Sequence, residues 1–315
     1  MTLKDLGEFG LIDRIRQGIS LPEGVLGIGD DCAILPQKDG NDTLVSTDML
    51  VEGSHFLLSG ISPYDLGWKS AAVNLSDLAA MGARPLASFL SLALSPKVDA
   101  EWMDEFLRGY RDISEKYSCP LLGGDTTASK ELVCINVAVL GEAPSGKAKL
   151  RSSACEGDLV CVSGCLGDSA AGLRLILDSE EGNPYLLDRH RHPEPRMAEG
   201  LALCADPGVH AMMDISDGVA SDLRHILKAS GKGAVIDTRR IPVSSALHDY
   251  CSEKGLDALE LALCGGEDYE LLFTISPEAE KRLKIKHFVI GRIEGPAEEL
   301  RFEGTDKDYL GFRHF

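Results

Sequence analysis

The sequence has little of what membrane, secreted and nucleic-acid-binding proteins require. Its most apolar stretch, Leu86 to Leu94, is about half the length that spans a bilayer, and the N-terminus has acidic residues but no apolar signal-peptide core. Lysine and arginine total 32 against 50 aspartate and glutamate residues, a net charge of −18. This disfavours a phosphate-backbone partner, but not a small nucleotide, because Mg²⁺ can bridge two anions. We expect a soluble cytoplasmic protein.

The cysteines do not have the pattern of a disulfide or zinc framework. There are nine, an odd number, and no C-x-x-C pair occurs. Several lie in apolar runs, as Cys134 does between Val133 and Ile135. We predict reduced cysteines in the protein core. Cys161 and Cys165 are close in sequence, but no second ligand pair follows them, which argues against zinc binding at that pair.

Two familiar nucleotide-binding motifs are incomplete. Gly141 to Lys147 has the spacing of a phosphate-binding P-loop, but Ala148 stands where a Mg²⁺-binding serine or threonine is needed. Gly27 and Gly29 lack the third glycine of a dinucleotide fingerprint. We interpret residues 141–149, rich in glycine, proline, serine and lysine, as a linker between two domains.

Apolar periodicity predicts an α/β or α+β chain in two lobes, residues 1–140 and 150–315. A length of 315 residues suits two domains of about 150 residues each. Ser62 and Gly82 have the residue types that begin and end a helix. The predicted strands are 43–47, 87–94, 132–140, 158–163, 234–236 and 270–275, and the predicted helices are 63–81, 100–117, 168–177, 221–229 and 245–253.

Aspartates beside small residues are the most informative feature that is present. They follow apolar runs, where a strand or helix gives way to a loop, in the stretches 29–31, 46–48, 74–77, 123–125 and 214–218. Carboxylates at such ends converge easily, and each pair at about 4 Å repels by roughly 4 kcal/mol at an effective dielectric near 20. Mg²⁺ relieves such repulsion and usually completes its shell with substrate phosphates. The pattern predicts a multi-Mg²⁺ site that handles a nucleotide.

Most of these stretches have a simpler explanation when taken singly. Residues 27–33 fit a β-turn, 46–48 a helix cap, and 265–270 a glycine-rich edge turn. The Gly-Gly-Asp at 123–125 suits either a tight hairpin or close approach to a phosphate. Asn74 and Asp77 are harder to explain, because they share one face of an otherwise apolar helix, where polar groups need partners.

Taken together and in order, the motifs closely resemble the thiamine-monophosphate kinase family, of the ATP-binding superfamily that includes aminoimidazole ribonucleotide synthetase and selenophosphate synthetase. The matching segments are 7–12, 27–33, 46–56, 74–83, 123–127, 214–218 and 265–271. The resemblance implies a PurM-like fold, with an N-terminal mixed-sheet lobe for dimerisation and ATP/Mg²⁺ binding and a C-terminal α/β lobe that completes the site. It also implies a homodimer, with ATP near the dimer interface.

The resemblance implies a role for each matching residue. Mg²⁺ ligands would be Asp31, Ser46, Thr47, Asp48, Asp77, Asp125, Asp214 and Asp217. ATP would be contacted by Gly124, Asp125, Arg151 and Ser216. Thiamine monophosphate would be contacted by His55, Glu267 and Tyr309. The catalytic set would be Asp48, Asp77, Asp125 and Asp217.

The implied reaction converts ATP and thiamine monophosphate into ADP and thiamine diphosphate. The acceptor phosphate is already anionic, so direct in-line transfer assisted by several Mg²⁺ ions needs no general base. The chain departs from the family pattern at Ala128, where arginine is frequent, and at Ser153, where glycine is usual. The alternatives are another enzyme of the superfamily, or a non-catalytic divalent-cation-binding protein, although no EF-hand loop occurs.

Overall fold

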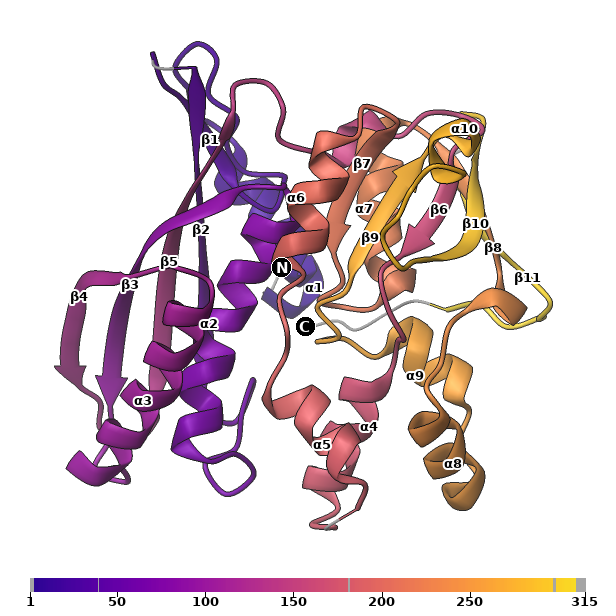
Figure 1. The fold of residues 1–315 in the computed structure, drawn as a ribbon. Helices are drawn as coiled ribbons and strands as arrows, with labels where there is room; N and C mark the ends of the chain where they lie inside the picture. Colours follow the sequence, from indigo (N-terminus) through magenta and orange to yellow (C-terminus); the bar gives the residue numbers. More distant parts are fainter. Residues whose placement is uncertain (1–2, 39, 181, 297–298, 310–315) are drawn as a thin grey trace.

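The computed structural model describes residues 3–38, 40–180, 182–296 and 299–309, and shows two lobes, each a β-sheet with helices packed against it (Figure 1). The outermost ends of the two predicted domains, 1–2 and 310–315, lie outside the described residues. The prediction of an α/β chain in two lobes is confirmed. Among the described residues, none of the helices has the length and apolar character needed to cross a bilayer.

The N-terminal lobe is a five-stranded mixed sheet with one helical face. Its elements are α1 (Leu3–Arg16), β1 (Ala33–Pro36), β2 (Asn41–Val51), α2 (Pro63–Ala80), β3 (Arg84–Leu94), α3 (Ala100–Lys116), β4 (Leu121–Ala128) and β5 (Cys134–Pro144). The strand order is β1-β2-β5-β3-β4, and only the β3–β4 pair is parallel. Helices α2 and α3 pack together on one face of this sheet (Figure 1). We call the opposite face, which carries Met49 and Phe89, the open face.

Helix α2 begins and ends where the sequence indicates. The Ser62 Oγ accepts a hydrogen bond from the Asp65 N–H at 3.1 Å, and Pro63 occupies the first turn, where a missing N–H costs nothing. The helix ends at Ala80, one residue earlier than predicted, with Met81 as its C-cap. Gly82 follows with a φ of +68°, the left-handed conformation that favours glycine after a helix.

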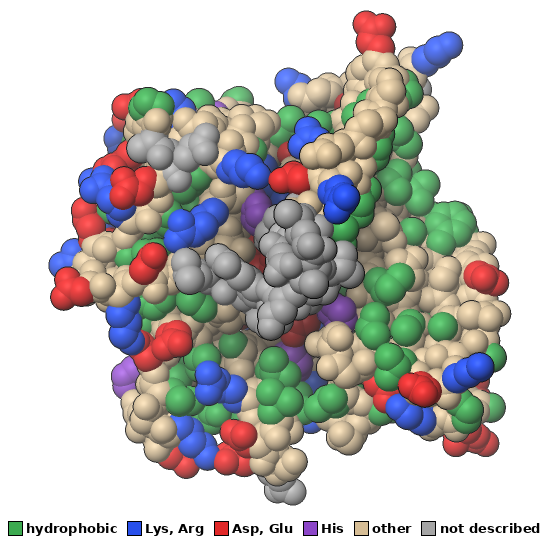
Figure 2. Space-filling model, turned by 180° about the vertical axis from the view of Figure 1, so that it is seen from behind, with side chains coloured by type: hydrophobic (Ala, Val, Ile, Leu, Met, Phe, Trp, Pro, Cys, Tyr) green, Lys and Arg blue, Asp and Glu red, His purple; other side chains and the backbone are tan. Residues whose placement is uncertain are grey.

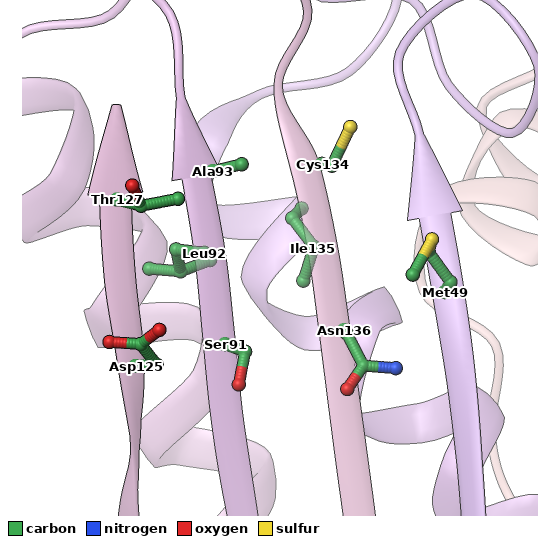
Figure 3. Close-up of a pocket in the computed structure, with 9 residues that line it drawn as sticks. All are labelled: Met49, Ser91, Leu92, Ala93, Asp125, Thr127, Cys134, Ile135 and Asn136. Carbon is green, nitrogen blue, oxygen red and sulfur yellow. The ribbon is translucent and has the colours of Figure 1, made fainter. Parts of the chain in front are cut away.

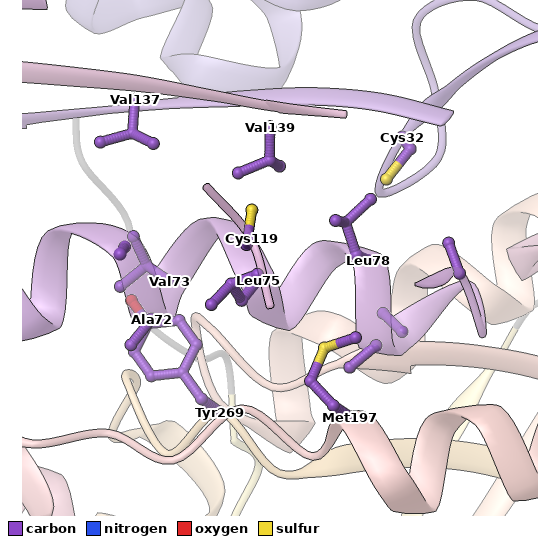
Figure 4. Packing of buried hydrophobic residues seen from close by; sticks show 14 of the residues in the cluster. Cys32, Ala72, Val73, Leu75, Leu78, Cys119, Val137, Val139, Met197 and Tyr269 are labelled. Atoms are coloured by element: carbon purple, nitrogen blue, oxygen red, sulfur yellow. The ribbon is translucent and has the colours of Figure 1, made fainter. Parts of the chain in front are cut away.

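Helix α2 lies between the two lobes and is buried almost all round, which is the pattern of a core helix. Figure 4 shows Val137 and Val139 of β5 on one side of it and Met197 and Tyr269 of the C-terminal lobe on the other. All four residues belong to one hydrophobic cluster with α2. Any polar side chain on this helix is therefore held at the junction of the lobes.

The C-terminal lobe is a six-stranded sheet with strand order β11-β8-β10-β6-β9-β7. Its elements are η1 (Arg151–Ser153), β6 (Leu159–Val162), α4 (Asp168–Leu177), α5 (Pro184–Arg191), α6 (Met197–Ala205), β7 (Val209–Asp214), α7 (Val219–Ser230), β8 (Gly233–Asp237), η2 (Thr238–Arg240), α8 (Ser245–Lys254), α9 (Ala258–Cys264), β9 (Leu271–Ile275), α10 (Pro277–Glu280), β10 (Phe288–Glu294) and β11 (Leu300–Glu303). Strand β7 is an edge strand, and it faces α2 across the junction (Figure 1).

Two sequence-based interpretations need correction. The segment 141–149, predicted as a linker, begins inside β5, which pairs with β2 as far as Pro144. The Gly-Gly-Asp at 123–125, for which a tight hairpin was one of two interpretations, lies inside edge strand β4, parallel to β3. A Cβ on Gly124 would stand 1.7 Å from the Leu90 carbonyl oxygen, so this glycine permits close strand packing.

Candidate functional site

Three buried or half-buried carboxyl groups from both lobes converge at the junction. Asp31 precedes β1, Asp77 lies on α2, and Asp214 ends β7. One carboxylate oxygen of each lies within 4.8 Å of the others. We call these three residues the acidic cluster. Its position depends on α2, which is packed against both sheets and so carries Asp77 to meet Asp214. Figure 2 shows acidic and histidine side chains between the two lobes.

Polar side chains of α2 and β2 fix the orientation of the cluster. The Ser46 Oγ donates to Oδ2 of Asp77, and the Ser76 Oγ donates to Oδ2 of Asp214 at 2.5 Å. The fully buried Asn74 accepts the Asp48 N–H at 3.0 Å. Asn74, Ser76 and Asp77 of this one helix thus hold groups from two strands, β2 and β7. This explains why a core helix carries polar residues.

One arginine from the second lobe neutralises part of the cluster. Arg151, in η1, donates through Nη2 to Oδ1 of Asp31, and its backbone N–H donates to Oδ2 of Asp30 at 3.1 Å. Its Nε lies 3.8 Å from Oδ1 of Asp30. The Oδ2 of Asp31 is buried and makes no hydrogen bond to the described residues. An ionised buried oxygen without a donor is a position that a cation can fill.

The carboxyl groups are strongly perturbed. Burial, followed by the charge of Asp31, raises the pKa of Asp30 to about 7, of Asp214 to about 7 and of Asp48 to about 6. Burial and then the charge of Asp48 raise the pKa of Asp77 well above its usual value. These carboxyls cannot all be ionised together without added positive charge. Oxygen donors in this number are the ligands that Mg²⁺ prefers.

A second group of polar side chains adjoins the cluster. Glu267, in the loop before β9, pairs with Lys69 of α2, and its N–H donates to the Ser216 carbonyl oxygen at 2.7 Å. Burial and then the charges of Glu267 and Asp48 raise the pKa of the neighbouring Tyr269, which places this loop beside the acidic cluster. The His55 Nδ1 accepts the Val51 N–H at 3.1 Å.

Comparison with known proteins agrees with this geometry. Residues 29–143 match the family model of the AIR synthase related protein N-terminal domain, and residues 156–298 match the model of the C-terminal domain. The thiamine-monophosphate kinase of Escherichia coli (strain K12) is 41% identical, covering 98% of each chain. The thiamine-monophosphate kinase of Aquifex aeolicus (strain VF5) is 38% identical, covering 100% of each chain.

The chain belongs to the thiamine-monophosphate kinase family. The solved structure of AaThiL complexed with AMPPCP and TMP superimposes on it with a TM-score of 0.91 and 36% identity, covering 100% of this chain and 99% of the other. The match confirms both the family resemblance seen in the motifs and the two-domain PurM-like fold that it implies. The chain is therefore an enzyme of this family.

The structure does not bring every residue expected from the kinase family to the cluster. Strand alternation turns Ser46 and Asp48 toward α2 but Thr47 toward the open face, where its Oγ1 accepts the Asn136 Nδ2–H at 2.9 Å. Asp125 also lies on the open face, exposed on the edge strand β4, next to Gly124. Tyr309 is 3% exposed and packs edge-on against Phe302 in the core of the C-terminal lobe.

The last two residues expected from the family, Ser216 and Asp217, lie in the turn that follows β7 in the C-terminal lobe. The N–H groups of Ser216 and Asp217 both donate to Oδ2 of the buried Asp222, at 3.1 and 3.2 Å. Burial, followed by the charges of Asp217 and Asp214, raises the pKa of Asp222 well above its usual value. The turn before α7 is thereby held against the end of β7.

Four residues at the site had no individual role predicted from the sequence: Asp30, Lys69, His190 and Asp222. Asp30 was visible as half of the Asp-Asp pair. Lys69 had a weaker signal, a single lysine in the apolar run that became α2. His190 and Asp222 lie outside the matching motifs, and only the fold shows that they support residues inside them.

Proposed function

We propose that the protein transfers the γ-phosphate of ATP to thiamine monophosphate, giving ADP and thiamine diphosphate. The observation that carries this proposal is the convergence of Asp31, Asp77 and Asp214 from both lobes. Such a cluster suits two polyanions that must be brought together. AaThiL has been solved with AMPPCP and TMP, an ATP analogue and a thiamine phosphate, which supports the same pair of substrates here.

The residues present fit bound Mg²⁺. The Oδ2 of Asp31 has no hydrogen-bond donor among the described residues, and burial raises the pKa of Asp77 and Asp214, so a cation beside these oxygens would stabilise their ionised forms. We propose that these three residues, with Asp48 and Ser46 beside them, hold Mg²⁺. When bound, Mg²⁺ would supply the positive charge that offsets the repulsion between the two phosphate groups.

The chain's own residues orient the substrates. Arg151 is anchored to Asp30 and Asp31 and can turn its charge to a phosphate when those carboxylates have other partners. Glu267 and His55, on the other side of the cluster, are proposed to hold thiamine monophosphate. The acceptor oxygen is already anionic, so alignment of the two phosphates is the main task.

We propose direct transfer without a phosphoenzyme. The thiol nearest the cluster, Cys32, is 1% exposed, and burial followed by the charge of Asp77 raises its pKa well above the usual value, so it stays protonated. Rapid-quench experiments with γ-labelled ATP should therefore label thiamine diphosphate and leave the protein unlabelled. A burst of protein-bound label would contradict direct transfer.

We also propose a homodimer formed through the open face of the N-terminal sheet. The register aligns Met49, Asn136, Ser91 and Asp125 in one row across four strands, lining a shallow cavity of about 180 Å³ (Figure 3). Two large apolar side chains of this face, Met49 and Phe89, are 58% and 38% exposed, and a partner would cover both. A partner on this face would place ATP contacts by Gly124 and Asp125 at the dimer interface.

The experiment is to incubate the protein with ATP, Mg²⁺ and thiamine monophosphate and to separate thiamine diphosphate by chromatography. Asp77→Asn should form product at least about 100-fold more slowly. Asp249→Asn, a change at a carboxyl that is 83% exposed, should behave as wild type. Product formed only from another acceptor would favour a different enzyme of the superfamily. ATP left unchanged with every acceptor would favour a cation-binding protein.

The nine free cysteines support the expectation of a reducing, cytoplasmic setting.

A further inference from the structure

A second set of metal-ligand side chains lies away from the acidic cluster. Cys155 and Asp158 come from the loop between η1 and β6, and His210 comes from edge strand β7. The thiol sulfur, one ring nitrogen and a carboxylate oxygen all lie within 4.8 Å of one another. His210 lies 52 residues after Asp158 in the sequence, so only the fold brings the three residues together.

The geometry of the three side chains is already organised. The His210 Nδ1 lies 2.8 and 2.9 Å from the two oxygens of Asp158, and the Cys155 N–H donates to Oδ2 of the same carboxylate at 2.9 Å. Asp158 is 2% exposed, whereas Cys155 is exposed and the His210 side chain is 28% exposed. A buried, oriented carboxylate with two accessible partners leaves a path by which an ion can enter from solvent.

The donor set selects a soft cation. The acidic cluster offers only oxygen atoms, which suit Mg²⁺. Sulfur, imidazole nitrogen and carboxylate oxygen together suit Zn²⁺, which commonly takes three protein ligands and one water. We propose that Cys155, Asp158 and His210 bind one Zn²⁺ ion.

The site would fix the loop that carries Arg151. Leu150 bridges to Ala211 of β7, Ser230 accepts the Ala154 N–H at 3.0 Å, and Ser230 donates to the Arg151 carbonyl oxygen at 2.9 Å. A metal joining Cys155 to His210 adds a further tie between this loop and β7. Zn²⁺ therefore acts as a clamp that keeps Arg151 at the acidic cluster.

The test uses the full chain after removal of metals, with millimolar Mg²⁺ present to occupy oxygen-only sites. Titration with Co²⁺ as a spectroscopic substitute for Zn²⁺ should give a thiolate-to-cobalt charge-transfer band at one equivalent, and Zn²⁺ should displace it. Cys155→Ser should abolish the band, and His210→Ala should weaken Zn²⁺ binding by about 30-fold or more. Cys134→Ser, at a partly exposed cysteine in β5, is the matched control and should leave both unchanged.

Several results would overturn the proposal. They are the absence of a thiolate band in wild type, a band that survives Cys155→Ser, or one lost equally in Cys134→Ser. Because the readout is the spectrum of the bound metal, it does not depend on kinase activity. A clear band in a protein that phosphorylates no acceptor would leave the Zn²⁺ site standing and remove the proposed reaction alone.

Discussion

The Nζ of Lys69 lies 3.0 Å from Oε1 of Glu267, and the lysine side chain has no exposed surface. The same Nζ lies 3.5 Å from Nε2 of His190, whose Nδ1 is 3.3 Å from Oε2 of Glu267. Burial and then the charge of Lys69 lower the pKa of His190 to about 3, so the ring is neutral at pH 7. Its Nε2 then accepts from Lys69 while its Nδ1–H faces Glu267. Lys69 and His190 are therefore positioning residues for Glu267.

Lys69→Met should damage the use of thiamine monophosphate more than that of ATP. Burial alone would raise the pKa of Glu267, but the charge of Lys69 offsets it and keeps the carboxylate ionised. Without Lys69 the carboxylate loses its lysine partner and keeps the neutral His190 beside it, at a cost of about 3 kcal/mol in stability. We expect the KM for thiamine monophosphate to rise by about tenfold, with little change in the KM for ATP.

The matched control is Lys97→Met, which removes a lysine that is 50% exposed and paired with Glu52 at 2.7 Å. This change should cost under about 1 kcal/mol and leave both KM values unchanged. The double variant Lys69→Met with Glu267→Gln should recover stability without recovering affinity for thiamine monophosphate. If the two KM values rose together in Lys69→Met, Lys69 would have a general structural role instead.

Asp77→Asn should remove catalysis without unfolding the protein. The side chain lies among like charges, so replacing it by a neutral amide of the same shape relieves repulsion from Asp48 and Asp214. We expect kcat to fall by about 100-fold or more, while the metal-free melting temperature stays level or rises. Steady-state kinetics and calorimetry on the same preparation check both. A large drop in melting temperature would show that Asp77 mainly supports the fold.

The position of α2 shows how far sequence reasoning reaches. The two ends of this helix could be predicted because each depends on a nearby residue. Ser62 caps the N-terminus, and Gly82 takes the left-handed conformation just after the C-terminus. Convergence of the aspartates could be predicted from their places after apolar runs, but the particular meeting of Asp77 with Asp31 depends on how two sheets pack around one helix. Strands β10 and β11 went unpredicted, since β10 carries polar residues and its pairing with β6 and β8 is set by the fold.

The misplaced motif at 123–125 has a physical reason. Two glycines before an aspartate are typical of a turn, but Gly124 is needed because the Leu90 carbonyl leaves no room for a Cβ. Strand β4 is also fully exposed, so it lacks the apolar alternation by which strands are recognised. For Tyr309, the contact that the structure shows is not the one predicted from the sequence. Motif position suggested a ligand contact, whereas packing against Phe302 places the ring in a core.

Metal-free protein should lose stability as pH rises from about 6.5 to 8. Asp30 and Asp214 have folded pKa values of about 7 against a usual 3.8, so the folded state holds protons that the unfolded state has released. Stability from such groups is present at low pH and is lost as pH passes through the folded pKa. The buried His190, with its lowered pKa, acts oppositely, but only below about pH 6.5.

Mg²⁺ should reverse this loss, because a bound cation replaces the lost protons. We expect Mg²⁺ to raise the melting temperature by several degrees at pH 8 and by less at pH 6.5, where it must compete with protons. Differential scanning calorimetry with and without Mg²⁺ measures both effects. Asp214→Asn should flatten the pH dependence. A metal-free melting temperature that increases from pH 6.5 to 8 would contradict the assignment of raised pKa values to the cluster.

Met49→Lys should dissociate the proposed dimer. Met49 lies in the open-face row with Asn136, Ser91 and Asp125, and a lysine there would have to be desolvated when a partner covers the face. Leu177→Lys, at an equally exposed leucine on α4, is the control and should remain dimeric. Sedimentation velocity at several protein concentrations separates the two. If ATP contacts lie at this interface, Met49→Lys should also raise the KM for ATP, whereas a wild-type monomer would exclude the dimer altogether.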